Sequence, residues 1–154
     1  MASWTWGTVG DRMVGPLLNT PMKALENYLG LAEREWPIHY RKKTTDGSAT
    51  TIATVPVPVD TTLYLECRIV ARRTGGAAGA ANDGAAYRLE VAAKNTAGTA
   101  AELAAETLAV IGESQAGWTV ASSASGGNIL VQVTGAANND VEWRLSLKKL
   151  AVKE

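Results

Sequence analysis

Apolar and polar residues alternate with a period of two along most of the chain after residue 49, which is the pattern of strands that bury one face. The clearest case spans residues 63–72. Its apolar positions, which we expect to face a core, are Leu63, Leu65, Cys67, Ile69 and Ala71. Its other positions, which we expect to face solvent or a neighbouring molecule, are Tyr64, Glu66, Arg68, Val70 and Arg72.

Shorter alternating runs predict further strands. Turn signals separate them about every eight to twelve residues, which is typical of antiparallel sandwiches and jelly rolls. Residues 99–106 are rich in alanine and therefore locally helix-prone. We predict an all-β domain of about seven strands, an antiparallel β-sandwich of jelly-roll type, with Trp118 and Trp143 filling its core. The further strands are expected at 49–55, 87–94, 106–112, from 117 onward, 129–133 and 141–148.

A different period precedes the strands. Between residues 18 and 36, six residues that can form one apolar stripe follow one another at spacings of 4, 3, 4, 3 and 4. This spacing is that of a coiled-coil seam, and it predicts a short N-terminal α-helix. Thr20 is a suitable N-cap, Pro21 suits the first helical position, and Pro37 ends the helix. So short a helix needs further contacts, either with copies of itself or with its own β-domain; the regular spacing favours copies. The residues expected at the interface between copies are Leu18, Met22, Leu25, Leu29, Ala32 and Trp36.

The segments on either side of the predicted helix are irregular. The first fifteen residues form an arm with Trp4 and Trp6, whose rings either dock into another molecule or fold back on their own domain. Residues 37–48 are predicted to be a connector that contains the only histidine, His39. The predicted domains are therefore 1–48, with arm, oligomerising helix and connector, and 49–154, the β-sandwich.

Composition narrows the function classes. The chain has 154 residues, of which 15 are basic and 15 acidic, so no global field attracts nucleic acid. Phenylalanine is absent, whereas five tryptophans are present. No run approaches the ~20 apolar residues of a membrane span, and the start lacks a secretory signal. We expect a soluble protein, made in the cytoplasm, without nucleic-acid binding or membrane insertion.

The usual catalytic and metal-binding combinations are missing from the sequence. A hydrolytic triad would have to use His39, and the single cysteine, Cys67, lies on an apolar strand face where a thiol is inert. A zinc site needs more Cys and His residues than these two. A carboxylate pair for glycoside cleavage is left open, although so small a module has little room for a glycan groove. We predict no enzymatic activity, no cofactor and no metal site.

Several segments of the predicted β-domain form a recurrent pattern. They are Ile69–Thr74, Ala86–Glu90, Val110–Glu113 with Gly117 and Trp118, Val131–Ala136, and Val141–Trp143. This pattern resembles a module common in structural proteins of tailed bacteriophages. Residues 18–26 similarly resemble the short helix that opens many phage fibre proteins. In such proteins the module is a non-enzymatic, C-terminal β-domain of a fibre or tail appendage, so the resemblance implies a virion component that trimerises.

The sequence therefore predicts a homotrimeric short tail fibre whose N-terminal arm attaches it to the virion. Its expected partners are copies of itself and other virion proteins of the baseplate, tail or capsid. One alternative is a capsid decoration protein of the same fold. Another is a carbohydrate- or receptor-binding module, in which exposed aromatic residues such as Tyr64 or Tyr87 stack on the sugar rings of a host surface glycan.

Overall fold

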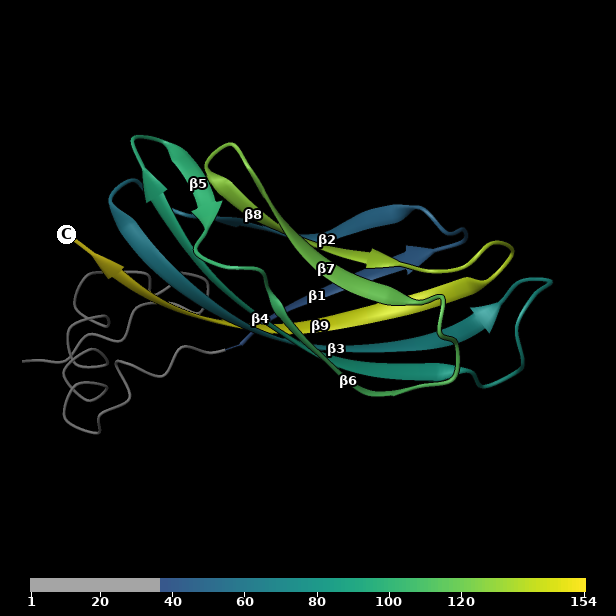
Figure 1. The fold of residues 1–154 in the computed structure, drawn as a ribbon. Coiled ribbons are helices and arrows are strands. Elements are labelled where there is room, and N and C mark those ends of the chain that lie inside the picture. Colours follow the sequence, from purple (N-terminus) through teal and green to yellow (C-terminus); the bar gives the residue numbers. More distant parts are fainter. Residues whose placement is uncertain (1–36) are drawn as a thin grey trace, which may run out of the picture. The chain divides into compact units, whose positions relative to one another are not determined.

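The computed structural model describes residues 37–154, which fold into nine antiparallel strands in two sheets (Figure 1). The larger sheet has the order β1-β9-β3-β4, and β5 and β6 pair with successive stretches of the remaining side of β4. The smaller sheet has the order β2-β8-β7. The strands are β1 (Ile38–Thr44), β2 (Ala49–Pro56), β3 (Thr61–Gly75), β4 (Gly84–Thr96), β5 (Thr99–Glu102), β6 (Thr107–Glu113), β7 (Thr119–Ser125), β8 (Asn128–Thr134) and β9 (Asp140–Lys153).

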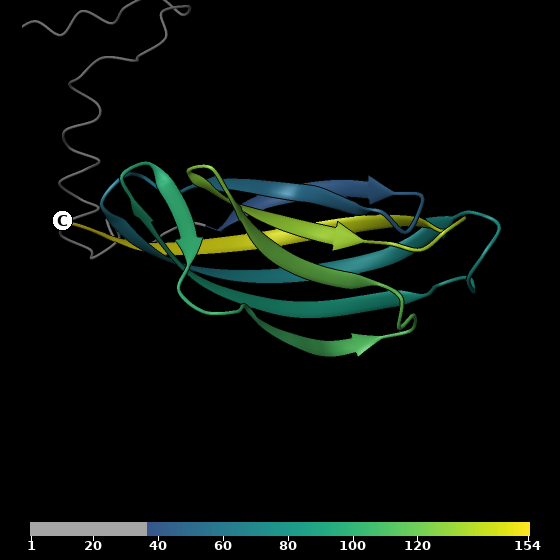
Figure 2. The same cartoon turned by 45° about the horizontal axis from the view of Figure 1, so that its top comes forward.

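The two sheets form two layers, as Figure 2 shows from a second direction. One layer consists of β2, β8 and β7, and the other contains β1, β9, β3, β4 and β6. At one end β5 approaches the smaller sheet, and the Oγ of Ser122 in β7 donates a hydrogen bond of 2.7 Å to the Oε1 of Glu102. The prediction of an all-β domain with antiparallel sheets is confirmed, while the narrower jelly-roll description stays a prediction.

The predicted N-terminal helix and arm lie outside the described residues. The trimer interface and the anchoring role of Trp4 and Trp6 therefore stay predictions. The interface residues concerned are Leu18, Met22, Leu25, Leu29, Ala32 and Trp36.

A cluster of aromatic rings occupies the core between the sheets. Trp143 of β9 and Trp118, directly before β7, are 0% and 1% exposed. The Trp143 ring lies 5.9 Å from that of Trp118 and 6.3 Å from that of Tyr87 in β4, measured between centroids. Two tryptophans thus fill the centre of a core without phenylalanine, as the alternation predicts.

The connector predicted over residues 37–48 is wrong for its first half, because Ile38–Thr44 form β1 beside β9. Only Thr44 of this strand is fully buried, and its Oγ1 accepts a 2.9 Å hydrogen bond from the Nε1 of Trp143. The other positions are basic, polar or only partly covered, because β1 is an edge strand. Period-two alternation of apolar residues is therefore absent from this strand, and the sequence pattern does not reveal it.

The local helix propensity of residues 99–106 is overridden by the tertiary structure. Thr99–Glu102 form β5, which makes a tight hairpin with the end of β4. Ala100 is buried, and its amide donates a 2.7 Å hydrogen bond to the carbonyl of Gly126 at the β7–β8 turn. Sheet pairing and burial decide the conformation here, because helix propensities of single residues are worth only tenths of a kcal/mol.

We expect Ala97→Asn to stabilise the protein. Ala97 and Gly98 form the β4–β5 turn with φ angles of 55° and 91°, the pair of positive values that a type I′ turn requires. Alanine is strained in this region, whereas asparagine tolerates it, so the gain in unfolding free energy should be about 0.5–1 kcal/mol. Thermal unfolding should then occur a few degrees higher. Thr99→Asn, at the neighbouring exposed position where β5 begins, is the control and should not raise the midpoint, because the φ of Thr99 is not positive.

Candidate functional site

The outer face of the larger sheet, defined as the side turned away from the smaller sheet, carries the exposed polar and apolar side chains of β1, β9, β3 and β4. In β3 the predicted alternation is confirmed, since the solvent-facing positions are exposed or partly exposed while the core positions are buried. The strand ladders fix which outer-face residues lie next to one another. We treat this regularly arranged face as the candidate site.

Like charges lie directly opposite each other in three places on the outer face. The ladders pair Arg41 with Arg144, Arg68 with Arg88, and Glu66 with Glu90. Such pairs are unfavourable unless other groups compensate them. Compensation runs along the strands: Arg68 contacts Glu66 at 2.9 Å, and Arg88 contacts Glu90 at 3.3 Å.

Two arginines share one carboxylate at the β1 edge. Glu142 of β9 accepts hydrogen bonds from Arg41 at 2.6 Å and from Arg144 at 3.3 Å. The hydrogen bond and positive charge of Arg41 hold the pKa of Glu142 below its ordinary value, and Arg144 acts in the same direction. The arginines of this face, with Arg72 of β3 included, outnumber these three glutamates, which leaves positive charge available to an anionic group.

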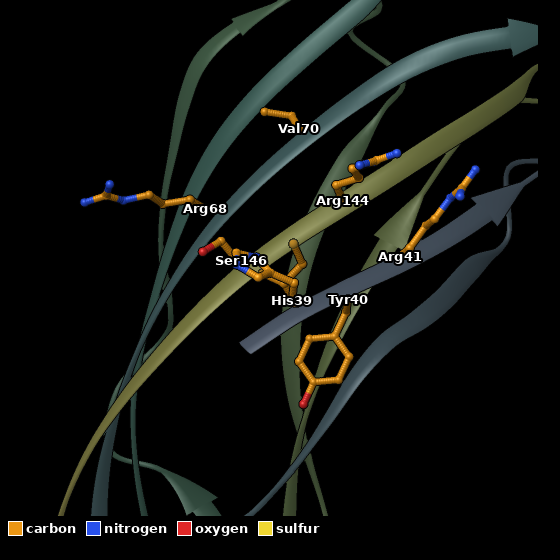
Figure 3. A pocket seen from close by; sticks show the side chains of 8 residues that line it. His39, Tyr40, Arg41, Arg68, Val70, Arg144 and Ser146 are labelled. Atoms are coloured by element: carbon orange, nitrogen blue, oxygen red, sulfur yellow. The ribbon is translucent and has the colours of Figure 1, made fainter. Parts of the chain in front are cut away.

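A shallow hollow of about 410 Å³ lies over β1, β9 and β3 (Figure 3). A second hollow of about 300 Å³ shares Val70 and Arg144 with it. Figure 3 shows Arg41 and Arg144 extending side by side, while Arg68 extends to the opposite side of the hollow. Guanidinium groups in such a setting can bind carboxylate, sulfate or phosphate groups. The first hollow is lined by His39, Tyr40, Arg41, Arg68, Val70, Arg144, Leu145 and Ser146.

An apolar row crosses the other end of the outer face. Leu150 of β9 lies opposite Tyr64 of β3, and Tyr64 lies opposite Ala92 of β4. Leu103, directly after β5, continues the row, because its amide donates a 2.8 Å hydrogen bond to the carbonyl of Ala92. The exposed fractions of Leu150, Tyr64 and Leu103 are 65%, 40% and 50%. Adjacent exposed apolar side chains of this kind mark contact surfaces.

The sequence alone identified only part of this apolar row. Tyr64 was expected on the outer face from the alternation of β3. Leu150 was missed because the last strand was predicted to end at residue 148, whereas β9 continues to Lys153. Leu103 was missed because its segment looked helix-prone. The alternation of Leu150 and Val152 with Lys149 and Lys153 was the signal that could have extended the strand.

Tyr87, predicted as an exposed platform for sugar rings, is buried instead. It is 2% exposed, and its hydroxyl lies 2.9 Å from the Oε2 of Glu113 and 3.2 Å from the carbonyl of Trp118. Burial, with the Glu113 carboxylate beside it, raises the pKa of Tyr87 strongly. Its position in the inward series of β4 explains the error, because the residue before Arg88 faces the core. Tyr64 is the tyrosine of this pair that remains accessible.

Cys67 lies in the core of β3, as predicted, with 0% exposure. Burial raises the pKa of its thiol to about 12, and the nearby Glu66 acts in the same direction. The thiolate is therefore disfavoured at neutral pH, as expected for an unreactive core cysteine.

We expect the alkaline side of the stability profile to depend on Cys67. Its thiol titrates near 9 when unfolded and near 12 when folded, so the stability it contributes is complete below pH 9 and is lost as pH rises toward 12. The loss should reach about 1.4 kcal/mol per pH unit at most. Urea unfolding between pH 8 and 11 should show a shallower decline for Cys67→Ala than for wild type. Parallel slopes would contradict a titrating buried thiol.

The described part of the chain has neither a metal-binding cluster nor a membrane-spanning helix. Within residues 37–154 no group of three or more His, Cys, Asp or Glu side chains is placed to hold a metal ion. The same residues contain no helix of the length and apolarity that a membrane crossing requires.

Comparisons with known proteins give similarity at the level of structure. No protein-family model and no curated protein matches the sequence. Similar solved structures include the tailspike of Acinetobacter baumannii phage AM24, at 10% identity and a TM-score of 0.39, covering 72% of this chain. A tailspike of A. baumannii phage Fri1, described as a capsular polysaccharide depolymerase, matches 74% of this chain at 13% identity and a TM-score of 0.37.

A third similar structure is the tailspike of Acinetobacter phage vB_ApiP_P1, at 18% identity and a TM-score of 0.35 over 74% of this chain. The chain spans 25%, 19% and 22% of these three proteins, in the order given. All three TM-scores lie below 0.5, so the function is argued below from the residues of this chain.

Proposed function

We propose that the chain is a non-enzymatic structural protein of a tailed-bacteriophage virion, built as a homotrimer and used as a short tail fibre. The recurrent segments of the β-domain and the N-terminal apolar seam support this proposal. In it, the arm with Trp4 and Trp6 attaches the protein to the virion, and the sandwich makes contacts with other subunits or other virion proteins.

The apolar row of the outer face is the observation that best supports a role in contacts with other subunits or proteins. Leu150, Tyr64 and Leu103 come from three different strands or strand ends, yet the ladders bring them side by side. Val152, at 71% exposure, extends the same surface on β9. Covering such side chains is worth about 25 cal/mol per Å² of apolar surface removed from water. Such an exposed apolar surface is consistent with a protein that functions as part of a larger assembly.

We expect the full-length chain to sediment at three times its 16.2 kDa mass at micromolar concentration. Leu25→Asp with Leu29→Asp should shift it to the mass of a single chain. Each copy then carries two negative charges in its apolar seam, and these charges oppose packing of the helices. Lys23→Asp with Asn27→Asp, which lie off the seam, is the matched control and should remain trimeric. A wild-type chain that sediments only as 16.2 kDa particles would contradict the homotrimer.

Location within the particle separates the tail fibre from the capsid alternative. Gold-labelled antibodies against residues 37–154 should mark the tail of the particle in electron micrographs. Label on the head would support a capsid decoration protein instead, and absence of label from purified particles would reject both virion roles.

A carbohydrate-binding role is the second candidate, favoured by Tyr64 and the arginine hollow. An exposed tyrosine ring can stack on one sugar of an oligosaccharide, and the guanidinium groups of Arg41 and Arg144, at the other end of the face, can bind acidic substituents of another sugar. Binding of acidic oligosaccharides on an array should then be lost in Tyr64→Ala and in Arg144→Gln. If the wild-type protein binds no acidic glycan at high concentration, the carbohydrate-binding role is ruled out.

A further inference from the structure

β1 and β6, which lie at opposite edges of the larger sheet, have opposite chemical character. Among the described residues, neither strand has a sheet partner on its outer side. β1 contains the run Arg41, Lys42 and Lys43 and no acidic residue. β6 contains no basic residue, ends at Glu113, and exposes three large aliphatic side chains, Leu108, Val110 and Ile111.

β6 lacks the lysines and prolines that usually protect an edge strand, although its ladder with β4 contains a bulge at Ile111. Lysines, prolines or very short length normally keep the free amide and carbonyl groups of an edge from pairing with another chain. β9 beyond Leu147, which has no partner on its β1 side within residues 37–154, has such protection in Lys148, Lys149 and Lys153. β6 has neither lysine nor proline over seven residues, and Val110 and Ile111 are 52% and 66% exposed. A partner strand is therefore expected on this edge.

The ladders show that the two edges match level by level. Continuous rows of paired residues cross all five strands from β1 to β6 on the inward side of the sheet. Two rows are apolar at both ends, and the third has a cation at one end and an anion at the other. The rows are Ile38–Leu147–Cys67–Leu89–Leu108, Tyr40–Leu145–Ile69–Tyr87–Val110, and Lys42–Trp143–Ala71–Ala85–Glu113.

We propose that β6 of one copy pairs with β1 of the next copy, so that the larger sheets join head to tail around the trimer. β1 and β6 run in the same direction, because four antiparallel steps separate them. A parallel ladder in this register continues the rows from one copy into the next, with Ile111, the extra residue of the β6 bulge, between the second row and the third. It brings Leu108 beside Ile38, Val110 beside Tyr40, and Glu113 beside Lys42 of the neighbouring copy.

Charge favours this head-to-tail contact over contacts between identical edges. Pairing β1 with β1 would bring two basic runs together, with Arg41, Lys42 and Lys43 on both sides. Pairing β6 with β6 would leave the basic edges free and bring two strands without positive charge together. Head-to-tail interfaces of this kind close into rings when the rotation allows it. The inference rests on the homotrimer of the proposed function and names its interface within the β-domain.

Engineered disulfides test the pairing in the full-length chain. In Ile38→Cys with Leu108→Cys, the two cysteines of one copy lie about 19 Å apart, four strand spacings, so they cannot bond to each other. Mild oxidation should join each copy to the next, and denaturing electrophoresis without reductant should show covalent trimers. Ile38→Cys with Ala109→Cys is the matched control. It should not cross-link, because Ala109 lies in the adjacent row and faces the other side of the sheet.

The outcomes separate this inference from the proposed function. Trimers by sedimentation without cross-linked species would overturn the edge pairing and leave the homotrimer standing. Dimers from Leu108→Cys alone would show β6 pairing with β6 and would also overturn it. Particles of single chain mass with no cross-linking would overturn both.

A charge reversal adds a readout that does not depend on cysteine. In the Ile38→Cys, Leu108→Cys background, Lys42→Glu places a negative charge opposite Glu113 and should lower the initial cross-linking rate about threefold or more. Lys94→Glu, on the outer face of β4 away from both edges, should leave the rate unchanged. Equal rates for the two variants would contradict a Lys42–Glu113 contact.

Discussion

Trp143→Ala is expected to lower the free energy of unfolding by about 3–5 kcal/mol, a large part of the stability of a domain of this size. The Trp143 ring is fully buried between Tyr87 and Trp118, so its removal leaves a cavity that both sheets border. It also leaves the buried Oγ1 of Thr44 without its hydrogen-bond donor. Urea unfolding followed by far-ultraviolet circular dichroism measures the loss.

Two phenylalanine variants separate packing from hydrogen bonding in this cluster. Trp143→Phe retains an aromatic ring but loses the 2.9 Å hydrogen bond to Thr44. Trp118→Phe removes a buried Nε1 that has no hydrogen-bond partner among the described residues. We therefore expect Trp143→Phe to be the more destabilising of the two by about 1–2 kcal/mol. Equal losses, or Trp143→Ala within 1 kcal/mol of wild type, would contradict the central role of this ring.

The core was accessible from the sequence because it follows period-two alternation. β3, β8 and the first half of β9 each place apolar residues at every second position, and those residues are buried in the structure. This pattern depends only on the geometry of a strand with one covered face. Trp118 and Trp143 could be assigned to the core for the same reason, since they belong to the inward series.

The elements that the sequence did not reveal depend on contacts between distant segments. β1 is an edge strand with basic residues, and β5 is an alanine-rich segment held by the β4 hairpin and by Gly126. The outer-face row joins Leu150, Tyr64 and Leu103, whose proximity depends on strand order rather than on local spacing. The register of each strand pair determines which residues become neighbours on the sheet, and this register cannot be read from a single sequence.

Gly76→Ala is expected to lower the free energy of unfolding by about 2–4 kcal/mol. Gly76 has a φ of 93°, and a Cβ at this position would collide with the carbonyl oxygen of Asn138 and lie 2.9 Å from the amide nitrogen of Asp140. The loop that contains Gly76 joins β3 to β4, while Asn138 belongs to the turn between β8 and β9. The collision therefore affects the contact between two separate turns, and a flexible side chain cannot absorb it.

Nearby hydrogen bonds explain why this loop cannot shift without further loss. The guanidinium of Arg73 donates to the carbonyl of Gly76 at 2.6 Å and to that of Ala78 at 2.7 Å, and the amide of Ala78 donates to Asn138 at 2.9 Å. Faster hydrogen exchange at the Ala78 amide should accompany the lower thermal midpoint of Gly76→Ala. Gly117→Ala is the control, because a Cβ there meets nothing within 4 Å, and its effect should stay within about 0.5 kcal/mol. Equal effects of the two substitutions would mean that the Gly76 loop does not hold these turns together.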